Sequence, residues 1–90
     1  MTDDHIAAAE RRVEQIWKDV LGLPEARPDA TFFESGGQSI AAVRIVARIE
    51  KELGVDVDMG DLFEDPDLAT FRHDVAVKAG SVAREDARSA

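Results

Sequence analysis

The sequence contains no cysteine among its 90 residues, and long apolar runs are missing as well. Without cysteine, neither a disulfide framework nor a thiolate metal site is available, so we expect a protein of the reducing cytoplasm. No apolar run approaches the ~20 residues that a membrane-spanning helix needs. The first residues, Met1 to His5, are acidic where a signal peptide would be basic. We therefore expect a soluble protein without a membrane partner.

Positive charge is scarce, and this limits the possible partners. The chain has 11 Lys and Arg against 19 Asp and Glu, which gives a net charge of -8. Nucleic-acid binding needs a basic face against the phosphates, so no nucleic-acid partner is expected. Six acidic residues fall in a stretch without Lys or Arg: Asp56, Asp58, Asp61, Glu64, Asp65 and Asp67. This stretch is either a solvated surface or a site that recognises basic patches on other proteins.

The small size of the chain argues against catalysis. A domain of this length buries only about 60 to 65 per cent of the surface that its unfolded chain exposes, which is too little for most enzymes to enclose a substrate. His5 and His73 are the only imidazole groups, and we expect both to be ordinary surface histidines, so a serine hydrolase is disfavoured. In the run from Asp56 to Asp67, Asp61 stands at the position where a calcium loop requires glycine, and Asp67 stands where it requires the final glutamate. We expect neither an enzyme nor a metal site.

Apolar residues recur at helical spacing in four segments, which predicts an all-α fold. The first predicted helix follows a cap at Thr2 or Asp3 and ends at Leu21, and the others span residues 39–53, 59–64 and 68 to about 79. Trp17 lies on the apolar stripe of the first helix and is expected in the core. We expect a small four-helix bundle, with three main helices and one short helix, over residues 1–80. Residues 81–90 are small and charged without a sustained stripe, and are expected to form a disordered tail.

A long loop, residues 22–38, separates the first two predicted helices and shows no periodicity. A loop of this length in a small domain usually has a function or its own anchors. Leu23, Phe32 and Phe33 are the expected anchors into the helical core. The loop would then deliver Ser39 to the surface, at the start of the second helix.

The end of this loop carries the most informative stretch of the chain: Phe32-Phe33-Glu34-Ser35-Gly36-Gly37-Gln38-Ser39-Ile40. The paired glycines release the backbone from the usual φ/ψ limits immediately before the second helix. Ser39 is therefore expected at a helix N-terminus, where free amide groups and the helix dipole favour an anion. Such a position suits a phosphodiester esterified to the hydroxyl.

This stretch resembles the phosphopantetheine-attachment motif of carrier proteins, which belong to the acyl carrier protein-like family. The Gly-Gly-x-Ser form is most similar to the peptidyl carrier (thiolation) proteins of nonribosomal peptide synthetases. Two positions differ, because Ser35 stands where the family commonly has leucine and Gln38 where it commonly has histidine or aspartate. The resemblance makes Ser39 the attachment residue, with Gly37 and Gln38 before it as further cofactor-binding residues, and makes residues 1–80 a carrier domain.

The resemblance also implies a cofactor and a set of partner enzymes. A phosphopantetheinyl transferase would attach phosphopantetheine to Ser39 from coenzyme A with magnesium. The thiol of the arm would then hold an aminoacyl, peptidyl or other acyl group as a thioester. An adenylation enzyme would load it, and condensation, tailoring or thioesterase enzymes would receive it from a monomeric carrier.

Four apolar residues near the predicted attachment site are candidates for partner docking: Ile40, Val43, Met59 and Phe63. Ile40 and Val43 lie on a strip of the second helix that the core does not require, and the resemblance makes Ile40 the first partner-facing residue. The alternative is that these side chains widen the core, and Phe63 fits that alternative well. Exposed apolar residues beside a modified serine would serve enzymes that must reach the arm.

Two other functions remain open. The chain is also compatible with an acyl carrier of the polyketide or fatty-acid type, which differs in the group that it carries. A small acidic helical adaptor is the second possibility. In an adaptor Ser39 would stay unmodified, the glycines would only shape a turn, and the same four apolar residues would form a constitutive groove.

Overall fold

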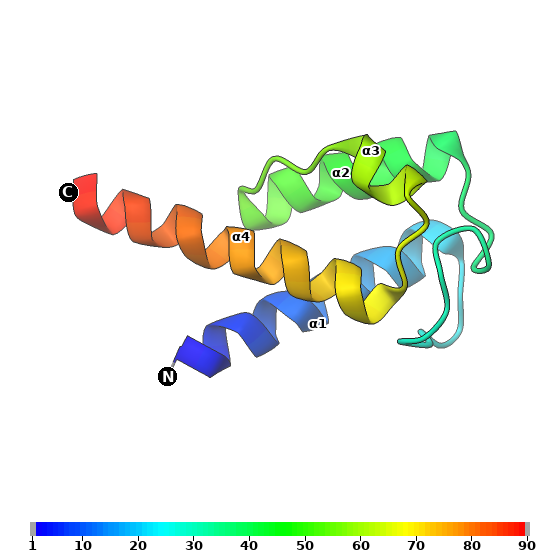
Figure 1. The fold of residues 1–90 in the computed structure, drawn as a ribbon, viewed down its shortest axis with the longest axis horizontal. Helices are drawn as coiled ribbons and strands as arrows, with labels where there is room; N and C mark the ends of the chain where they lie inside the picture. The colour runs from blue at the N-terminus through cyan, green and yellow to red at the C-terminus, as the bar shows by residue number, and fades with distance from the viewer. Residues whose placement is uncertain (1, 90) are drawn as a thin grey trace.

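The computed structural model describes the backbone of residues 2–89 and the side chains of residues 5–80. It contains α1 (Thr2–Leu21), α2 (Ser39–Leu53), α3 (Met59–Phe63) and α4 (Leu68–Ser89). Over residues 2–89 no strand is formed, and the only bridge of β type joins Thr31 to Asp67. Helix α1 runs antiparallel to both α2 and α4, and the 22–38 loop crosses one end of the bundle (Figure 1). The predicted all-α bundle is confirmed.

Local capping groups set the helix boundaries. Gly54 takes the left-handed conformation, with φ of 69°, and its N–H donates to the Glu50 carbonyl at 2.9 Å, which ends α2. The Asp58 carboxylate accepts a hydrogen bond from the Gly60 N–H at 2.9 Å and so begins α3. Between these two helices Val55 and Val57 are buried, so the connecting segment is itself anchored in the core.

Trp17 lies at the centre of the core. Its ring centroid is 5.9 Å from that of Phe32, in an edge-to-face arrangement, and 5.8 Å from that of Phe71. All three rings are buried. Aromatic pairs at these distances add to the stability from buried area. The aromatic cluster therefore joins α1, the long loop and α4, and the prediction that Trp17 is a core residue is confirmed. Other buried side chains surround it: Val13, Ile16, Ala42, Ile45, Ile49, Leu62, Leu68 and Val75.

One of the three residues predicted to anchor the 22–38 loop in the core, Phe33, is not buried. Phe32 is buried and Leu23 packs against the core, but Phe33 is 49% exposed. Consecutive side chains of the loop point in different directions, so only one of the two phenylalanines can enter the interior. The Phe33 ring instead covers the neighbouring Phe32 ring, with 5.6 Å between the centroids.

Helix α4 is longer than the sequence predicted. The sequence predicts an end near residue 79 because residues 81–90 carry no sustained apolar stripe, whereas the helical backbone continues through Gly80 to Ser89. Glycine inside a helix costs only ~1 kcal/mol relative to alanine, so it does not by itself end one. The side chains of residues 81–90 lie outside the described residues, and a domain boundary at residue 80 with a disordered tail beyond it stays a prediction. No helix in the described part of the chain has the length and apolar character needed to cross a bilayer.

The cap of α4 predicts an acid-sensitive contribution to stability. A hydrogen bond from the Thr70 side chain, supported by backbone hydrogen bonds at Asp67 and Thr70, lowers the pKa of Asp67 from its usual value of 3.8. A carboxylate with a lowered pKa stabilises the fold above its unfolded pKa and loses that contribution as the pH falls through the folded one. We expect Asp67→Asn to lower the melting temperature near neutral pH and to approach the wild type at a pH of about 3.

The matched control is Asp56→Asn, which changes an exposed aspartate outside the helix caps. Thermal melts of the three proteins across this pH range would check the prediction. A constant gap between wild type and Asp67→Asn at every pH would contradict it.

Candidate functional site

Ser39 is the first residue of α2, and its side chain is exposed. The preceding Gln38 is extended, with φ of -140° and ψ of 173°, and its side chain makes no capping hydrogen bond. The first hydrogen bond of the helix runs from the Ala42 N–H to the Gln38 carbonyl at 2.9 Å. The N–H groups of Ser39, Ile40 and Ala41 therefore have no intrahelical acceptor. The predicted helix start is confirmed.

The electrostatic setting of this helix start suits an anion. The free N–H groups point outward at the positive end of the helix dipole. No acidic residue lies in the first turn of α2, although the chain as a whole carries a net charge of -8. A phosphodiester on the Ser39 hydroxyl would meet these N–H groups without repulsion from a carboxylate in the same turn. The residues present thus fit a covalently attached phosphate ester.

The two glycines before Ser39 have different roles. Gly36 has a φ of 90°, a conformation that side chains with a Cβ rarely adopt. Gly37 lies against the Phe32 ring, where an added Cβ would come within 2.5 Å of a ring carbon. The Gly37 N–H also donates to the Phe32 carbonyl at 2.9 Å, which closes the turn. Through this contact the buried Phe32 ring sets the position from which the chain enters α2.

Surface polar contacts that were not predicted from the sequence also hold this turn. The Thr31 N–H donates to the Glu34 carboxylate at 2.9 Å, and the Glu34 N–H donates to the Thr31 hydroxyl at 3.2 Å. The Phe33 N–H donates to the Asp65 carboxylate at 2.8 Å, from the segment before α4. The Thr-x-x-Glu spacing is that of a capping box, so the first pair was detectable in the sequence. The contact with Asp65 was not, because 32 positions separate the two residues.

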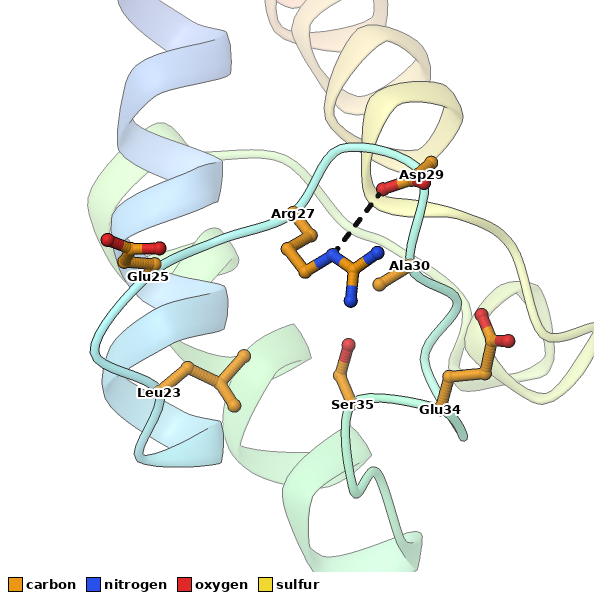
Figure 2. A pocket seen from close by; sticks show the side chains of 7 residues that line it. All are labelled: Leu23, Glu25, Arg27, Asp29, Ala30, Glu34 and Ser35. Atoms are coloured by element: carbon orange, nitrogen blue, oxygen red, sulfur yellow. Dashed lines mark ion pairs between the residues drawn. The ribbon is translucent and has the colours of Figure 1, made fainter.

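Ser35, the other serine of the motif, does not lie at the start of a helix. Ser35 is half-buried, and its side chain and that of Arg27 point toward one another across a shallow hollow beside the loop (Figure 2). The Arg27 guanidinium lies 3.8 Å from the Asp29 carboxylate on the same rim. Of the two serines, Ser39 alone stands exposed at a helix N-terminus.

The four predicted docking residues are all exposed. The exposed fraction is 67% for Ile40, 51% for Val43, 38% for Met59 and 43% for Phe63. They come from α2 and α3, which pack against each other. None of them widens the core, so that alternative is wrong, including for Phe63. Their role in docking stays a prediction.

The contact between Gly37 and Phe32 can be tested by substitution. Gly37→Ala places a methyl group where the Phe32 ring lies, and we expect the free energy of unfolding to fall by ~1 to 3 kcal/mol. The control Gly80→Ala meets no atom within 4 Å and lies inside a helix, so it is expected to leave stability unchanged or slightly higher. Urea denaturation would measure both. Equal stability of Gly37→Ala and the wild type would contradict the proposed role of this contact.

Comparison with known proteins identifies the family. The family model described as "Phosphopantetheine attachment site" matches residues 11–73. The chain is 37% identical over 65 residues to the dapdiamide synthesis protein DdaD of Enterobacter agglomerans, covering 72% of this chain and 11% of that protein. It is 42% identical over 60 residues to surfactin synthase subunit 3 of Bacillus subtilis (strain 168), covering 67% of this chain and 5% of that protein. The chain thus spans about a tenth or less of the length of these relatives.

Two solved structures share the fold. BlmI, described as a type-II acyl-carrier-protein from Streptomyces verticillus involved in bleomycin biosynthesis, superposes with a TM-score of 0.73 at 28% identity, covering 83% of this chain and 90% of BlmI. The A-PCP protein McyG, complexed with phenylalanyl-adenylate, superposes with a TM-score of 0.66 at 30% identity, covering 74% of this chain and 10% of McyG. The chain therefore belongs to the phosphopantetheine attachment family, as a carrier domain of the peptidyl carrier type that holds phosphopantetheine covalently.

Proposed function

We propose that Ser39 is the residue that carries phosphopantetheine, and that the chain moves aminoacyl and peptidyl groups between enzymes of nonribosomal peptide biosynthesis. The observation that carries this proposal is the exposed Ser39 hydroxyl at the start of α2, beside helix N–H groups that no side chain caps. When bound, phosphopantetheine supplies a thiol that holds the acyl group as a thioester. The protein supplies position and recognition.

The residues around Ser39 have distinct tasks in this proposal. The turn closed on Phe32 projects the Ser39 hydroxyl into solvent, where a phosphopantetheinyl transferase can bring coenzyme A and magnesium. The N–H groups of the first turn of α2 stabilise the negative charge of the phosphodiester once it has formed. Gln38 is exposed and neutral, so it brings no negative charge against the ester. Gly37 keeps the turn closed.

In this proposal the chain is a carrier that depends on partner enzymes for all catalysis. Among residues 5–80 no charged or polar side chain is buried, so the described residues offer no desolvated acid or base for catalysis by the chain itself. An adenylation enzyme loads the arm, as the A-PCP arrangement of McyG suggests, and condensation, tailoring or thioesterase enzymes receive the acyl group. We infer a monomer that works in the cytoplasm, where coenzyme A and ATP are available.

Substitution of the attachment residue tests the proposal directly. Intact mass after incubation with coenzyme A, magnesium and a broad-specificity phosphopantetheinyl transferase should rise by one phosphopantetheine group in the wild type. Ser39→Ala should show no gain, because the only exposed hydroxyl at the start of α2 is lost. Ser35→Ala removes the half-buried serine four residues earlier and should be modified fully.

Circular dichroism would show that all three proteins keep their helical content. Modification of Ser39→Ala, or no modification of a folded wild type by several transferases, would overturn the proposal. The adaptor interpretation would then take its place.

The docking residues yield a second prediction. Val43→Ala removes two exposed methyl groups beside the attachment site, and we expect kcat/KM for Ser39 modification to fall by about threefold or more. Val77→Ala makes the same change at an exposed position of α4 and should leave kcat/KM unchanged. Both variants should keep their stability within ~0.5 kcal/mol of the wild type, because the side chains are exposed. Equal kcat/KM values for the two variants would show that Val43 takes no part in docking.

A further inference from the structure

The 22–38 loop is hydrogen-bonded to the first turn of α4. The Leu68 N–H donates to the Ala30 carbonyl at 3.1 Å, and the Ala69 N–H donates to the Pro28 carbonyl at 2.9 Å. N–H groups in the first turn of a helix have no intrahelical acceptor, so here the loop supplies one for each of these two donors. The loop and the start of α4 are therefore held together as one unit.

The Phe32 turn, residues 31–37, leads from this unit into α2 and satisfies most of its N–H groups internally. Acceptors within the turn serve the N–H groups of Thr31, Glu34, Ser35, Gly36 and Gly37. The other two donors reach outside the turn: the Phe32 N–H donates to the Pro66 carbonyl at 3.0 Å, and the Phe33 N–H donates to the Asp65 carboxylate at 2.8 Å. The placement of the turn on the bundle therefore depends on these two bonds and on the buried Phe32 ring.

Asp65 is unusual in both its contact and its backbone. Among residues 5–80 it is the only side chain from outside the Phe32 turn that hydrogen-bonds to the turn. It also has a φ of 61°, and no other described residue except glycine has a positive φ. Aspartate and asparagine enter this left-handed conformation more readily than most residues, because their short side chains can hydrogen-bond nearby. A strained backbone that the surrounding contacts hold in place points to a role for the residue.

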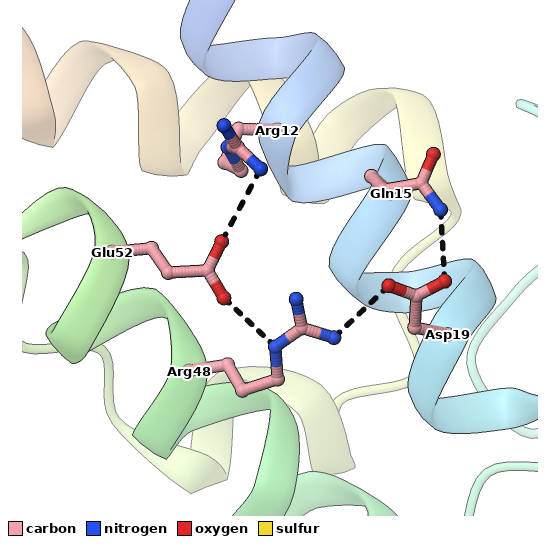
Figure 3. A network of polar contacts seen from close by, with 5 residues as sticks. All are labelled: Arg12, Gln15, Asp19, Arg48 and Glu52. Carbon is pink, nitrogen blue, oxygen red and sulfur yellow. Dashed lines mark hydrogen bonds and ion pairs between the residues drawn. The ribbon is translucent and has the colours of Figure 1, made fainter.

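Ion pairs fix the other end of α2 independently of the Phe32 turn. The Arg48 guanidinium lies 2.8 Å from Glu52 and 3.1 Å from Asp19 on α1, and Glu52 also lies 3.5 Å from Arg12 (Figure 3). This network lies in the second half of α2, away from Ser39. Because helix ends fray, contacts in the second half do not fix the first turn. The arrangement of the residues around Ser39 therefore depends on the Phe32 turn and on what holds it.

We propose that Asp65 is a positioning residue for the modification of Ser39, because its carboxylate fastens the Phe32 turn to the segment before α4. The inference rests on the proposed function, since it concerns the attachment of phosphopantetheine to Ser39. Without this bond the Phe33 N–H turns to water, and the turn is free to tilt about the Phe32 ring. Only a fraction of the molecules then presents Ser39 in the arrangement that the transferase modifies. Such a loss raises the apparent KM for the carrier and leaves kcat unchanged.

The experiment separates the acceptor from the backbone conformation. Asp65→Gly removes the acceptor, and glycine adopts the left-handed conformation without strain. Asp65→Asn keeps an acceptor oxygen at the same position and tolerates the same backbone. Asp67→Gly is the matched control, because it removes a carboxylate two positions further on that bonds to Thr70 and not to the Phe32 turn. The readout is KM and kcat for modification of the whole chain by a broad-specificity phosphopantetheinyl transferase with coenzyme A and magnesium.

We expect Asp65→Gly to raise KM by about three- to tenfold and to keep kcat within about twofold of the wild type. Asp65→Asn and Asp67→Gly should stay within about twofold of the wild type in both constants. Hydrogen exchange of the Phe33 N–H, followed by NMR, should become faster in Asp65→Gly and stay unchanged in Asp65→Asn. A purely structural role would lower the melting temperature without separating the KM values of Asp65→Gly and Asp67→Gly.

Equal KM values for Asp65→Gly and Asp67→Gly would overturn the proposal. A rise in KM for Asp65→Asn as large as that for Asp65→Gly would also overturn it, because asparagine keeps the acceptor. Circular dichroism would show whether the variants keep their helical content. If Asp65→Gly does not fold, Asp65→Ser takes its place, since its oxygen lies one bond closer to the backbone, and the same rise in KM is expected of it.

A failure of the proposed function would look different. Wild type that is modified at Ser39, together with an Asp65→Gly variant of unchanged KM, would overturn the positioning role and leave carriage intact. Folded wild type that no transferase modifies would instead refute the proposed function, and the positioning role with it.

Discussion

The contact between the Phe32 ring and Gly37 is the constraint on which the site depends. The ring is held in the core by Trp17, whose centroid lies 5.9 Å away, and its other side accepts the backbone of Gly37 so closely that no Cβ would fit. Trp17 is in turn fixed by packing in α1 and against Phe71 of α4. Through the Phe32 ring, the packing of α1 and α4 therefore fixes where α2 begins. Because packed interiors deform little, the Ser39 hydroxyl is held at a defined place on the surface.

The core of the protein supplies its stability, and the surface carries the group that is modified. The described core contains no charged side chain, and its one unpartnered polar side-chain atom is the indole Nε1 of Trp17. The polar contacts that hold the Phe32 turn, from Thr31, Glu34 and Asp65, lie at the surface. A carrier needs this division, because its reactive group must pass from one enzyme to another. Contacts with each enzyme must be brief, so modest exposed patches serve better than a large apolar interface. The exposed face of α2 and α3 has that character.

Much of this arrangement could be predicted from the sequence, because it depends on local patterns. The bounds of α2 follow from the glycine pair before Ser39 and from Gly54 after Leu53, and the place of Trp17 follows from helical periodicity. The burial of Phe32 alone could not be predicted, since neighbouring aromatic residues in an irregular loop look equivalent in a sequence. The contact of Phe33 with Asp65 and the full length of α4 also escaped prediction. The first depends on a distant segment. The second was missed because residues 81–89 are helical without a sustained apolar stripe.

The central claim is that the fold presents Ser39, and not the neighbouring serine, as the attachment residue. The most direct measurement is fragmentation mass spectrometry of the tryptic peptide that contains both Ser35 and Ser39, taken from protein modified with coenzyme A. The account predicts that every fragment that retains Ser39 carries the phosphopantetheine group, and that fragments with Ser35 alone do not. Localisation of the group on Ser35, or its division between the two serines, would contradict the account.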